Sequence, residues 1–515
     1  MRPSRNTSPR PPVWLIPVLW TLALGLWGLS RQHSMWRDEA ATWQAAQRPP
    51  ADLCRMLRSI DVVHGLYYLL MHELFACFGA STTTLRLPSV LAMAVAAGCV
   101  AVLGRRLAGP RAGLAAGTVF GLLPAVQFYL QEGRPYALVT AGVAVATLLL
   151  VTLLQGHGGT GRWAAYGGTV ALCGLLNWLS LLMLLAHAAT LLWTRAGRGP
   201  AKRWAAASAA ATAAVLPLIL YSRTQQHQVA WIAPLTWSKL IAPAVLLVIG
   251  ALAAAALRPA AGRLSAATVG LPLLAAPQLA LLAISLSHPL YLDRYVVFSL
   301  LGLALLIGAA LDAAARATAR GWLVPAAVTA LTLALLPQCV AERSPSSRVD
   351  DVLAVAAHVQ RLKSPDAAVL FLPSWRRDTA YVSPDAFAGL HDIALSEDPL
   401  QSATLEGVEA PPARIRTAML AQHRILLVTD ADFTAEANAT ARDRTKMSVL
   451  HSHFTKVADI SARGRRVLVF ERRTPKAPGI RPAASRGLPL AHTTDLSGRT
   501  PRPAPRRETL PTPRR

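Results

Sequence analysis

Charged residues are scarce in this sequence. They make up 15% of its 515 residues, whereas 53% are hydrophobic; a soluble globular chain is about a quarter charged. This composition excludes an ordinary soluble protein and requires long apolar runs, of which 14–29 is the first and 322–340 the last. Runs of about 20 residues match the hydrocarbon thickness of a bilayer. The sequence therefore predicts an all-α polytopic membrane bundle with about eleven transmembrane helices.

Acidic residues are scarcer than basic ones. The chain has 27 Asp and Glu against 52 Lys and Arg, a net charge of +25. A nucleic-acid-binding protein would explain such an excess, but here it lies in short loops between apolar runs and in a Pro/Arg-rich tail. Short basic loops mark the cytoplasmic side of membrane proteins. We therefore expect membrane lipids and no nucleic acid among the partners, and a multi-pass protein of the plasma membrane.

Cysteine is also rare, with five residues in the whole chain. They show no metal-ligand spacing, so the sequence carries no cysteine signal for a metal site. Cys54 and Cys77 fall in one predicted outer loop, and whether they form a disulfide stays open at the level of sequence.

The basic loops predict the topology. Residues 1–12 would be cytoplasmic, and the first apolar run is longer than a signal peptide's and lacks a cleavage site, so we expect it to be the first span. Residues 31–84 would then form a large outer loop. The clusters "RRLAGPR", "TRAGRGPAKR" and "ARATAR" all fall on the inner side, as the positive-inside rule requires. The transmembrane domain would cover 13–340.

After residue 340 the pattern changes. "DDVLAVAAHVQRLKSPDAAVLFLPS" is typical of an amphipathic helix, a turn and a buried strand. "HRILLVTDADFTAEANATARDR" predicts a second strand and helix, and "RRVLVFERR" predicts a closing strand. Strands that alternate with helices indicate a small α/β domain, which we place at 349–473 and, after an odd number of spans, outside the cytoplasm. Residues 475–515 have little apolar content and are expected to be disordered.

Few acidic residues are available for chemistry in the bundle. From residue 86 to residue 320 the only ones are Glu132, Asp293 and Asp312. Asp312 lies near a predicted cytoplasmic helix end, four residues before Arg316, so we expect a local ion pair there. Glu132 and Asp293 both fall in predicted outer loops.

Three outer loops repeat a combination of carboxylate and arginine. The residues are Arg37, Asp38 and Glu39; Glu132 and Arg134; and Asp293 and Arg294. Charges near a membrane are costly unless they are paired or functional. Arginine forks match phosphate oxygens, and carboxylates act as general bases or bind divalent cations. The pattern suits a substrate with a phosphate and a lipid tail, and the alternative is a set of ion pairs that anchor helix ends.

An aromatic helix is predicted in the first outer loop. In "VVHGLYYLLMHELFACFG" the side chains of His64, Tyr67, Tyr68 and His72 fall on or near one helical face, and the apolar content suits a helix in the membrane interface. His64 and Tyr68 are candidate substrate contacts, together with Tyr136 of "QEGRPYAL". Isolated histidines are more often structural, so for both histidines a structural role is the alternative.

These segments resemble the GT-C glycosyltransferases, in particular family 39-like membrane transferases akin to protein O-mannosyltransferases and aminoarabinose transferases. The likeness rests on "RDEAATW", "HGLYYLLMHELFACFGASTTTLRLPS", "QEGRPYAL" and "LDRYVVFSLLGLALLIGAAL", and covers roughly residues 12 to 340. It implies transfer of a sugar from a polyprenyl-phosphate donor on the outer face of the membrane. Mannose is the sugar that bacterial relatives suggest. The acceptor stays open between protein, polysaccharide and glycolipid.

The resemblance also implies roles for individual residues. Asp38 corresponds to the acidic residue of the family's first outer loop and Glu132 to that of the second. Asp38 would be the base that activates an acceptor hydroxyl for inverting attack, and Glu39 would orient it or, with Asp38, hold a divalent cation such as Mg²⁺ or Mn²⁺. Arg134 and Arg294, with Arg37, would stabilise the lipid-phosphate leaving group. Many relatives have His-Pro-Pro where this chain has His64-Gly65-Leu66, a departure at the His64 position.

Two other functional classes fit a polytopic protein. A transporter or lipid flippase usually has polar or broken helices near the membrane midplane and repeated halves, and this sequence shows neither a mid-span acidic residue nor an obvious internal repeat. A non-catalytic scaffold built around the outer domain is the third reading. Retention of phenotype after loss of the charged loops would favour that scaffold.

Overall fold

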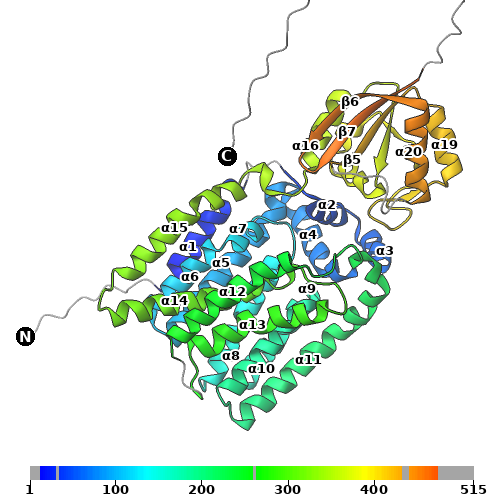
Figure 1. The fold of residues 1–515 in the computed structure, drawn as a ribbon. Helices are drawn as coiled ribbons and strands as arrows, with labels where there is room; N and C mark the ends of the chain where they lie inside the picture. Colours follow the sequence, from blue (N-terminus) through cyan, green and yellow to red (C-terminus); the bar gives the residue numbers. More distant parts are fainter. Residues whose placement is uncertain (1–11, 30–33, 259–261, 432–439, 474–515) are drawn as a thin grey trace, which may run out of the picture. The chain divides into compact units, whose positions relative to one another are not determined.

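The computed structural model describes residues 12–29, 34–258, 262–431 and 440–473 (Figure 1). The predicted disordered tail, 475–515, and all but the last residue of the predicted cytoplasmic segment 1–12 lie outside these ranges.

Helices make up the first part of the chain. They are α1 (Leu15–Leu26), α2 (Arg37–Ala46), α3 (Pro50–Ser59), η1 (Val62–His64), α4 (Gly65–Phe78), α5 (Thr82–Leu107), α6 (Pro110–Leu122), α7 (Pro124–Tyr129), α8 (Tyr136–Leu154), α9 (Thr160–Leu176), η2 (Trp178–Leu182), α10 (Met183–Trp193), α11 (Arg198–Ser222), η3 (Arg223–Val229), α12 (Trp237–Ala256), α13 (Ala266–Ser285), η4 (Asp293–Tyr295), η5 (Val297–Ser299), α14 (Leu300–Ala317) and α15 (Leu323–Glu342). A short turn, η6 (Pro345–Ser347), follows.

The predicted membrane bundle is confirmed as a fold, and the first and last apolar runs, 14–29 and 322–340, coincide with α1 and α15. In the described part of the chain, seven helices are long and apolar enough to cross a membrane. Two other apolar stretches are interrupted. One breaks before Pro124, between α6 and α7, and the stretch 163–193 turns at Asn177. The total of about eleven spans stays a prediction.

Small residues allow the central helices to approach closely. α5 and α6 pack side by side, and a Cβ on Gly113 would lie 2.3 Å from the carbonyl oxygen of Ala101. α13 and α14 repeat the arrangement, because a Cβ on Gly302 would lie 2.3 Å from the carbonyl oxygen of Gly270. Membrane helices pack through small residues in this way because apolar side chains gain little from leaving lipid. These contacts fix the scaffold that carries the predicted outer loops.

In its described part, residues 34–84, the predicted outer loop is itself mostly helical. Its α4 turns Tyr67, Tyr68, Met71 and Phe75 inward and exposes Leu66, Leu69, Leu70 and Phe78. Apolar side chains therefore cover both faces of α4, which is what a helix between protein and membrane interface requires.

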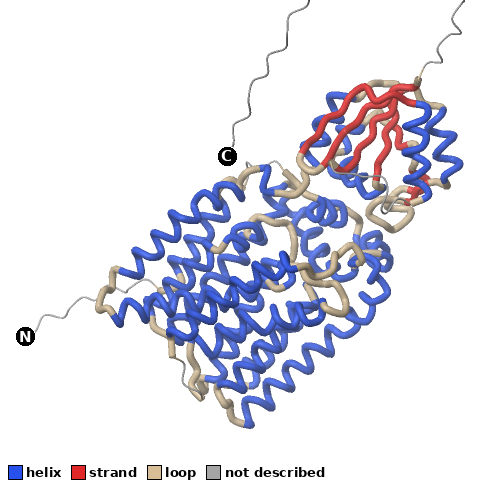
Figure 2. Tube along the Cα trace, viewed as in Figure 1, coloured by secondary structure: helices blue, strands red, loops and turns tan. Residues whose placement is uncertain are grey.

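Strands occur, among the described residues, only in the C-terminal domain (Figure 2). Its elements are α16 (Val352–Leu362), β1 (Ala367–Leu372), η7 (Ser374–Arg377), α17 (Asp378–Val382), α18 (Pro384–Phe387), β2 (His391–Asp392), β3 (Leu395–Glu397), β4 (Val408–Glu409), α19 (Pro412–Leu420), β5 (Arg424–Asp430), α20 (Ala441–His453), β6 (Phe454–Ala462) and β7 (Arg465–Arg472). The main sheet has the order β2-β1-β5-β7-β6. β1 pairs in parallel with β2 and β5, whereas β7 is antiparallel to β5 and β6.

The predicted small α/β domain is confirmed, with differences in detail. The three predicted strands are β1, β5 and β7, all rich in buried aliphatic residues. The sequence reading missed β6, which has an exposed, partly charged surface along most of its length, so that its apolar signal is weak. A helix was predicted directly after β5, but α20 begins only at Ala441, and residues 432–439 lie outside the described ranges.

Two smaller expectations can be judged. Asp312 and Arg316 form the predicted ion pair at the end of α14. Cys54 and Cys77 are both exposed free thiols, so the disulfide that the sequence left open is not formed here.

Candidate functional site

The carboxylate of Asp38 lies where three predicted outer loops meet. Asp38 is the second residue of α2, and its Oδ2 lies 2.5 Å from Nη1 of Arg294 and 3.9 Å from Nη2 of Arg134. Its side chain keeps 21% of its surface exposed, whereas those of Arg134 and Arg294 keep 7% and 11%. The structure thus joins one accessible carboxylate to two nearly buried guanidinium groups from distant parts of the sequence.

Aromatic rings surround the Arg294 guanidinium. Its carbon lies 5.6 Å from the ring centroid of Trp231 and 5.9 Å from that of Tyr295, within the range of cation–π attraction. The backbone N–H of Arg294 donates to Oδ1 of Asp293 at 2.9 Å. Asp293 is exposed and shapes the η4 turn, so the structure gives it a local role in orienting the loop that carries Arg294.

Arg134 is held by three side chains besides Asp38. Its Nη1 donates to the hydroxyls of Tyr68 at 3.2 Å and Thr42 at 3.4 Å, and its Nη2 lies 3.4 Å from Nε2 of His64. The Nε of Arg134 is buried and has no hydrogen-bond partner in the described part of the chain. The guanidinium is therefore fixed in orientation without being fully satisfied, as expected of a group that binds an anion.

His64 belongs to this cluster and is neutral. Burial, together with the positive charges of Arg134 and Arg294, lowers the pKa of His64 well below its ordinary value. Since arginine can only donate, Nε2 must be the acceptor, and the remaining proton lies on Nδ1. That Nδ1 is buried and has no partner among the described residues. A neutral histidine with a spare donor is a candidate substrate contact, as the sequence suggested.

The sequence reading missed Asp61. Its Oδ2 accepts from the Tyr68 hydroxyl at 2.8 Å, and burial raises the pKa of Asp61. The residue has a left-handed backbone with φ of 58°, an uncommon conformation in which Asp is enriched. Its N–H donates to Gln228 Oε1 at 3.1 Å, and the N–H of Val62 donates to Gln225 Oε1 at 3.0 Å, so η3 supports the turn. The only sequence signal for Asp61 was that it is an acidic residue three positions before His64.

Glu39 points away from Asp38 into the bundle. Arg86 of α5 donates from Nε to Oε1 at 2.7 Å and from Nη2 to Oε2 at 2.6 Å, and both side chains are fully buried. The N–H of Gly133 adds a third bond to Oε1 at 2.9 Å. Burial alone would raise the pKa of Glu39, but Arg86, Arg348 and the Gly133 amide together lower it. The carboxylate is thus ionised, and both of its oxygens are bonded to the protein. Glu39 therefore holds α2 in position and offers no free oxygen to an acceptor.

The expected cation site of Asp38 and Glu39 does not fit this arrangement. Both oxygens of Glu39 are occupied by Arg86, and Asp38 faces Arg294. Within the described ranges no group of three His, Cys, Asp or Glu side chains is arranged to hold a metal ion. Divalent cations of the Mg²⁺ type need several oxygen donors in one sphere.

Glu132 is a buried carboxyl group without a hydrogen-bond partner. It is 1% exposed, and neither carboxyl oxygen is bonded to any described residue, although its carbonyl accepts from Ser89 at 2.5 Å. Burial raises the pKa of Glu132 to about 8, against the opposing charge of Arg348. Glu132 is therefore largely protonated at neutral pH and can donate a proton or a hydrogen bond.

Arg348, beside Glu132, was not singled out from the sequence. It follows the last long apolar helix, is 4% exposed, and donates from Nη2 to the carbonyl oxygen of Gln131 at 2.6 Å. Its guanidinium carbon lies 4.1 Å from the ring centroid of Phe128. Burial lowers the pKa of Arg348, and Glu39 and Glu132 oppose that shift. A basic residue in a polar linker is expected to be exposed, so the sequence carried no sign that Arg348 would be buried.

Three other selected residues lie at the margin of the cluster. The Arg37 guanidinium carbon is 5.5 Å from the ring centroid of Trp375 in the C-terminal domain, so it does not join Arg134 and Arg294. The buried ring of Tyr136 lies 6.2 Å from that of Tyr295 between centroids, with the two rings tilted by 59°, and adds aromatic surface beside the site. His72 bonds to the carbonyl oxygen of Ala46 at 2.9 Å, a structural contact between α4 and α2.

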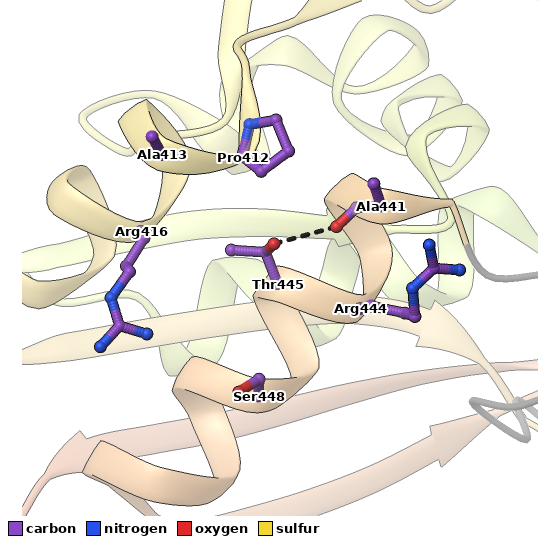
Figure 3. A pocket seen from close by; sticks show the side chains of 7 residues that line it. All are labelled: Pro412, Ala413, Arg416, Ala441, Arg444, Thr445 and Ser448. Atoms are coloured by element: carbon purple, nitrogen blue, oxygen red, sulfur yellow. Dashed lines mark hydrogen bonds between the residues drawn. The ribbon is translucent and has the colours of Figure 1, made fainter.

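A separate surface pocket of about 420 Å³ lies between α19 and α20 (Figure 3). Its lining comprises Pro412, Ala413, Arg416, Ala441, Arg444, Thr445 and Ser448. The Thr445 hydroxyl bonds back to the carbonyl oxygen of Ala441 at 2.9 Å, within its own helix. None of the residues selected from the sequence lines this pocket.

One known protein family matches part of the chain. The family described as dolichyl-phosphate-mannose-protein mannosyltransferase matches residues 64–222, a segment that includes His64, Tyr68, Glu132 and Arg134. No curated protein sequence matches the chain closely enough to count as a relative.

Two solved structures share the fold. ArnT from Cupriavidus metallidurans, in the apo state and bound to undecaprenyl phosphate, superposes in each case with a TM-score of 0.57 at 15% identity. Each alignment covers 88% of this chain and 97% of ArnT. The resemblance to GT-C glycosyltransferases of the protein mannosyltransferase and ArnT type is therefore confirmed by a matching family segment and a shared fold.

Proposed function

We propose that this protein is a membrane glycosyltransferase that moves a sugar from a polyprenyl-phosphate donor to an acceptor hydroxyl on the outer face of the membrane. One observation carries the proposal: the partly exposed Asp38 carboxylate lies between the guanidinium groups of Arg294 and Arg134. A base beside two phosphate-binding groups is what this transfer requires. The matched family takes its name from a dolichyl-phosphate-linked sugar, and one ArnT structure holds undecaprenyl phosphate.

Arg134 and Arg294 bind the phosphate of the donor in this proposal. Their charge-assisted bonds strengthen as the bond between sugar and phosphate breaks and negative charge collects on the leaving oxygen. The donor's phosphate takes the place of Asp38 as the partner of Arg294, which frees the carboxylate for the acceptor. The aromatic rings of Trp231 and Tyr295 lie within cation–π range of the Arg294 guanidinium and help to hold it in place.

Asp38 is the general base. It removes the proton from an acceptor hydroxyl, whose oxygen attacks the anomeric carbon from the side opposite the phosphate. The bond from the anomeric carbon to the phosphate oxygen breaks, its electron pair leaves with the lipid phosphate, and the configuration at the sugar inverts. Protonated Glu132 and the Nδ1 proton of His64 are available as donors to the sugar or to the phosphate. The family description makes mannose the first donor to test.

The experiment is release of polyprenyl phosphate from polyprenyl-phosphate-mannose by protein purified into lipid nanodiscs. Asp38→Asn keeps the size of the side chain and removes the base, and loss of a general base lowers rates by about 10²–10⁴-fold. Asp52→Asn is the matched control, because Asp52 lies in the same outer segment and its described ion pair is with Arg55 alone. Wild-type release that survives in the control and disappears in Asp38→Asn supports the proposal.

Two other outcomes would contradict parts of this proposal. Unchanged release by Asp38→Asn would remove the base from this position. If the wild type released nothing from mannose or other sugar donors, with a cell-envelope extract as the source of acceptor and with or without Mg²⁺ or Mn²⁺, the transporter reading would take precedence. Comparison of turnover with and without a chelator decides metal dependence in the same assay.

A further inference from the structure

The helix that carries Asp38 begins without a capping side chain of its own. α2 starts at Arg37 after Trp36, and no side chain from that cap position bonds to the helix. The first backbone N–H groups of a helix have no partner within it, and Ser, Thr, Asp or Asn usually satisfies them. Here Asp350, 313 residues further along the chain, accepts the Arg37 N–H through Oδ1 at 3.0 Å.

The other oxygen of Asp350 is held by the C-terminal domain. Nη1 of Arg376 lies 2.7 Å and Nη2 of Arg465 lies 2.9 Å from Oδ2. Arg465 is fully buried and is paired in turn with Asp378. Burial alone would raise the pKa of Asp350, but Arg465 and Arg376 lower it, so the carboxylate is ionised. One carboxylate thus connects the start of α2 to a fixed ion network.

Asp351 and Val352 repeat the contact one step along the chain. The N–H of Met35 donates to Asp351 Oδ1 at 3.3 Å, and the N–H of Val352 donates to the Met35 carbonyl at 2.7 Å. Oδ2 of Asp351 is paired with Arg463 at 2.5 Å. Residues 35–37 are therefore clamped by residues 350–352, and Asp38 is the next residue of the chain.

The position of Asp38 depends on both sides of this turn. From within the bundle, Glu39 is fixed by Arg86 and Gly133. From the C-terminal domain, Asp350 fixes the amide one residue before Asp38. A catalytic group displaced by about 1 Å loses about 100-fold in rate, so the first turn of α2 has to be held firmly.

We infer that Asp350 is a positioning residue for the proposed base Asp38, capping α2 from the C-terminal domain through the Arg376–Arg465 ion network; the inference rests on the proposed function. Asp350 touches no reacting atom. It acts by holding the backbone at Arg37, so its removal lowers kcat and leaves the KM for the donor nearly unchanged, because Arg134 and Arg294 keep their own contacts. A residue that merely stabilises the domain would not produce this split.

The test compares three variants in nanodiscs. Asp350→Ala removes both connections, whereas Asp350→Asn keeps a carbonyl oxygen for the Arg37 N–H and loses the ion pairs. Asp378→Asn is the control, since the side-chain bonds described for Asp378 are with Arg465 and Thr379 and none is with α2, although α17 packs against that helix. Each is measured for kcat and KM of polyprenyl phosphate release, for thermal unfolding, and for hydrogen exchange of the amides of residues 35–40.

We expect kcat to fall about 10–100-fold in Asp350→Ala, with partial recovery in Asp350→Asn and near wild-type values in Asp378→Asn. Amide exchange at 35–40 should accelerate in the same order. Unchanged kcat or unchanged exchange in Asp350→Ala would overturn the inference, and so would an equal loss in Asp378→Asn. If the wild type releases no polyprenyl phosphate, the proposed function fails instead, and the exchange data alone decide whether Asp350 holds α2.

Discussion

Asp38 and Glu39 are adjacent carboxylates on one helical turn, yet they lie in opposite environments. Glu39 is fully buried against Arg86, whereas Asp38 keeps a fifth of its side chain exposed opposite Arg294. Two donors of Arg86 and one backbone amide fill the oxygens of Glu39. The comparison shows what separates a structural ion pair from one that can take part in a reaction. A carboxylate that is buried and has all its hydrogen bonds made by the protein stabilises the fold. A carboxylate that is partly exposed can exchange its arginine partner for a substrate.

Removing the buried partner gives the largest expected effect. Arg86→Ala leaves the ionised Glu39 without its guanidinium, and breaking a buried ion pair in this way destabilises a protein by about 3–5 kcal/mol. Thermal unfolding and yield of folded protein in detergent are the measurements. The double variant Arg86→Met with Glu39→Leu removes both charges and should recover much of that stability. A single variant as stable as the wild type would contradict the structural role.

Removing the exchangeable partner should affect activity more than stability. Arg294→Ala takes away a guanidinium that the proposed mechanism uses at the leaving phosphate, which lowers kcat by about 10²–10³-fold. Its effect on thermal unfolding should be smaller than that of Arg86→Ala, because the Asp38 side chain keeps 21% of its surface exposed and can be hydrated when its partner is removed. Arg294→Lys, which keeps the charge but not the fork, should recover part of the rate. Equal losses of stability in Arg294→Ala and Arg86→Ala would contradict the distinction between a structural and an exchangeable ion pair.

A smaller effect concerns Glu132 and pH. Its pKa is raised by burial to about 8 in the folded protein, from 4.5 for an exposed glutamate. Above the unfolded pKa the unfolded chain releases this proton and the folded protein keeps it, so stability falls as pH rises from about 4.5 to about 8 and then levels off. Glu132→Gln mimics the protonated form and removes this contribution. Melting temperatures of both proteins at several pH values measure it, and parallel curves would disprove the raised pKa.

Sequence alone was enough to select the charged residues that meet in the candidate site, because acidic residues are so rare in the bundle. Asp38, Glu132, Arg134 and Arg294 all stood out as charges in otherwise apolar or aromatic loops. Arg86 carried a signal that was not used, since an arginine within an apolar helix needs a partner. The partner itself could not be predicted, because nothing in the sequence says which of two neighbouring carboxylates turns inward.

The contact of the C-terminal domain with α2 could not be predicted from sequence patterns, for a different reason. Asp350 and Asp351 precede an amphipathic helix, where acidic residues are expected as caps, and Asp351 does cap α16. The local explanation therefore suffices for both residues and hides the contact of Asp350 with Arg37. Helix and strand positions were predictable from periodicity, whereas bonds across more than 300 residues depend on how the folded elements meet.

The clamp at residues 350–352 also orders events during synthesis. Arg37 emerges early in translation, Asp350 follows only after α15, and Arg465 comes near the end of the described chain. Until the ribosome has passed residue 350, the start of α2 lacks its acceptor, and until it has passed residue 465 that acceptor lacks one of its two arginine partners. A nascent chain that already has its helices up to α15 is therefore still unfinished at the turn before Asp38, and Arg465, the first residue of β7, is the last of these partners to be made.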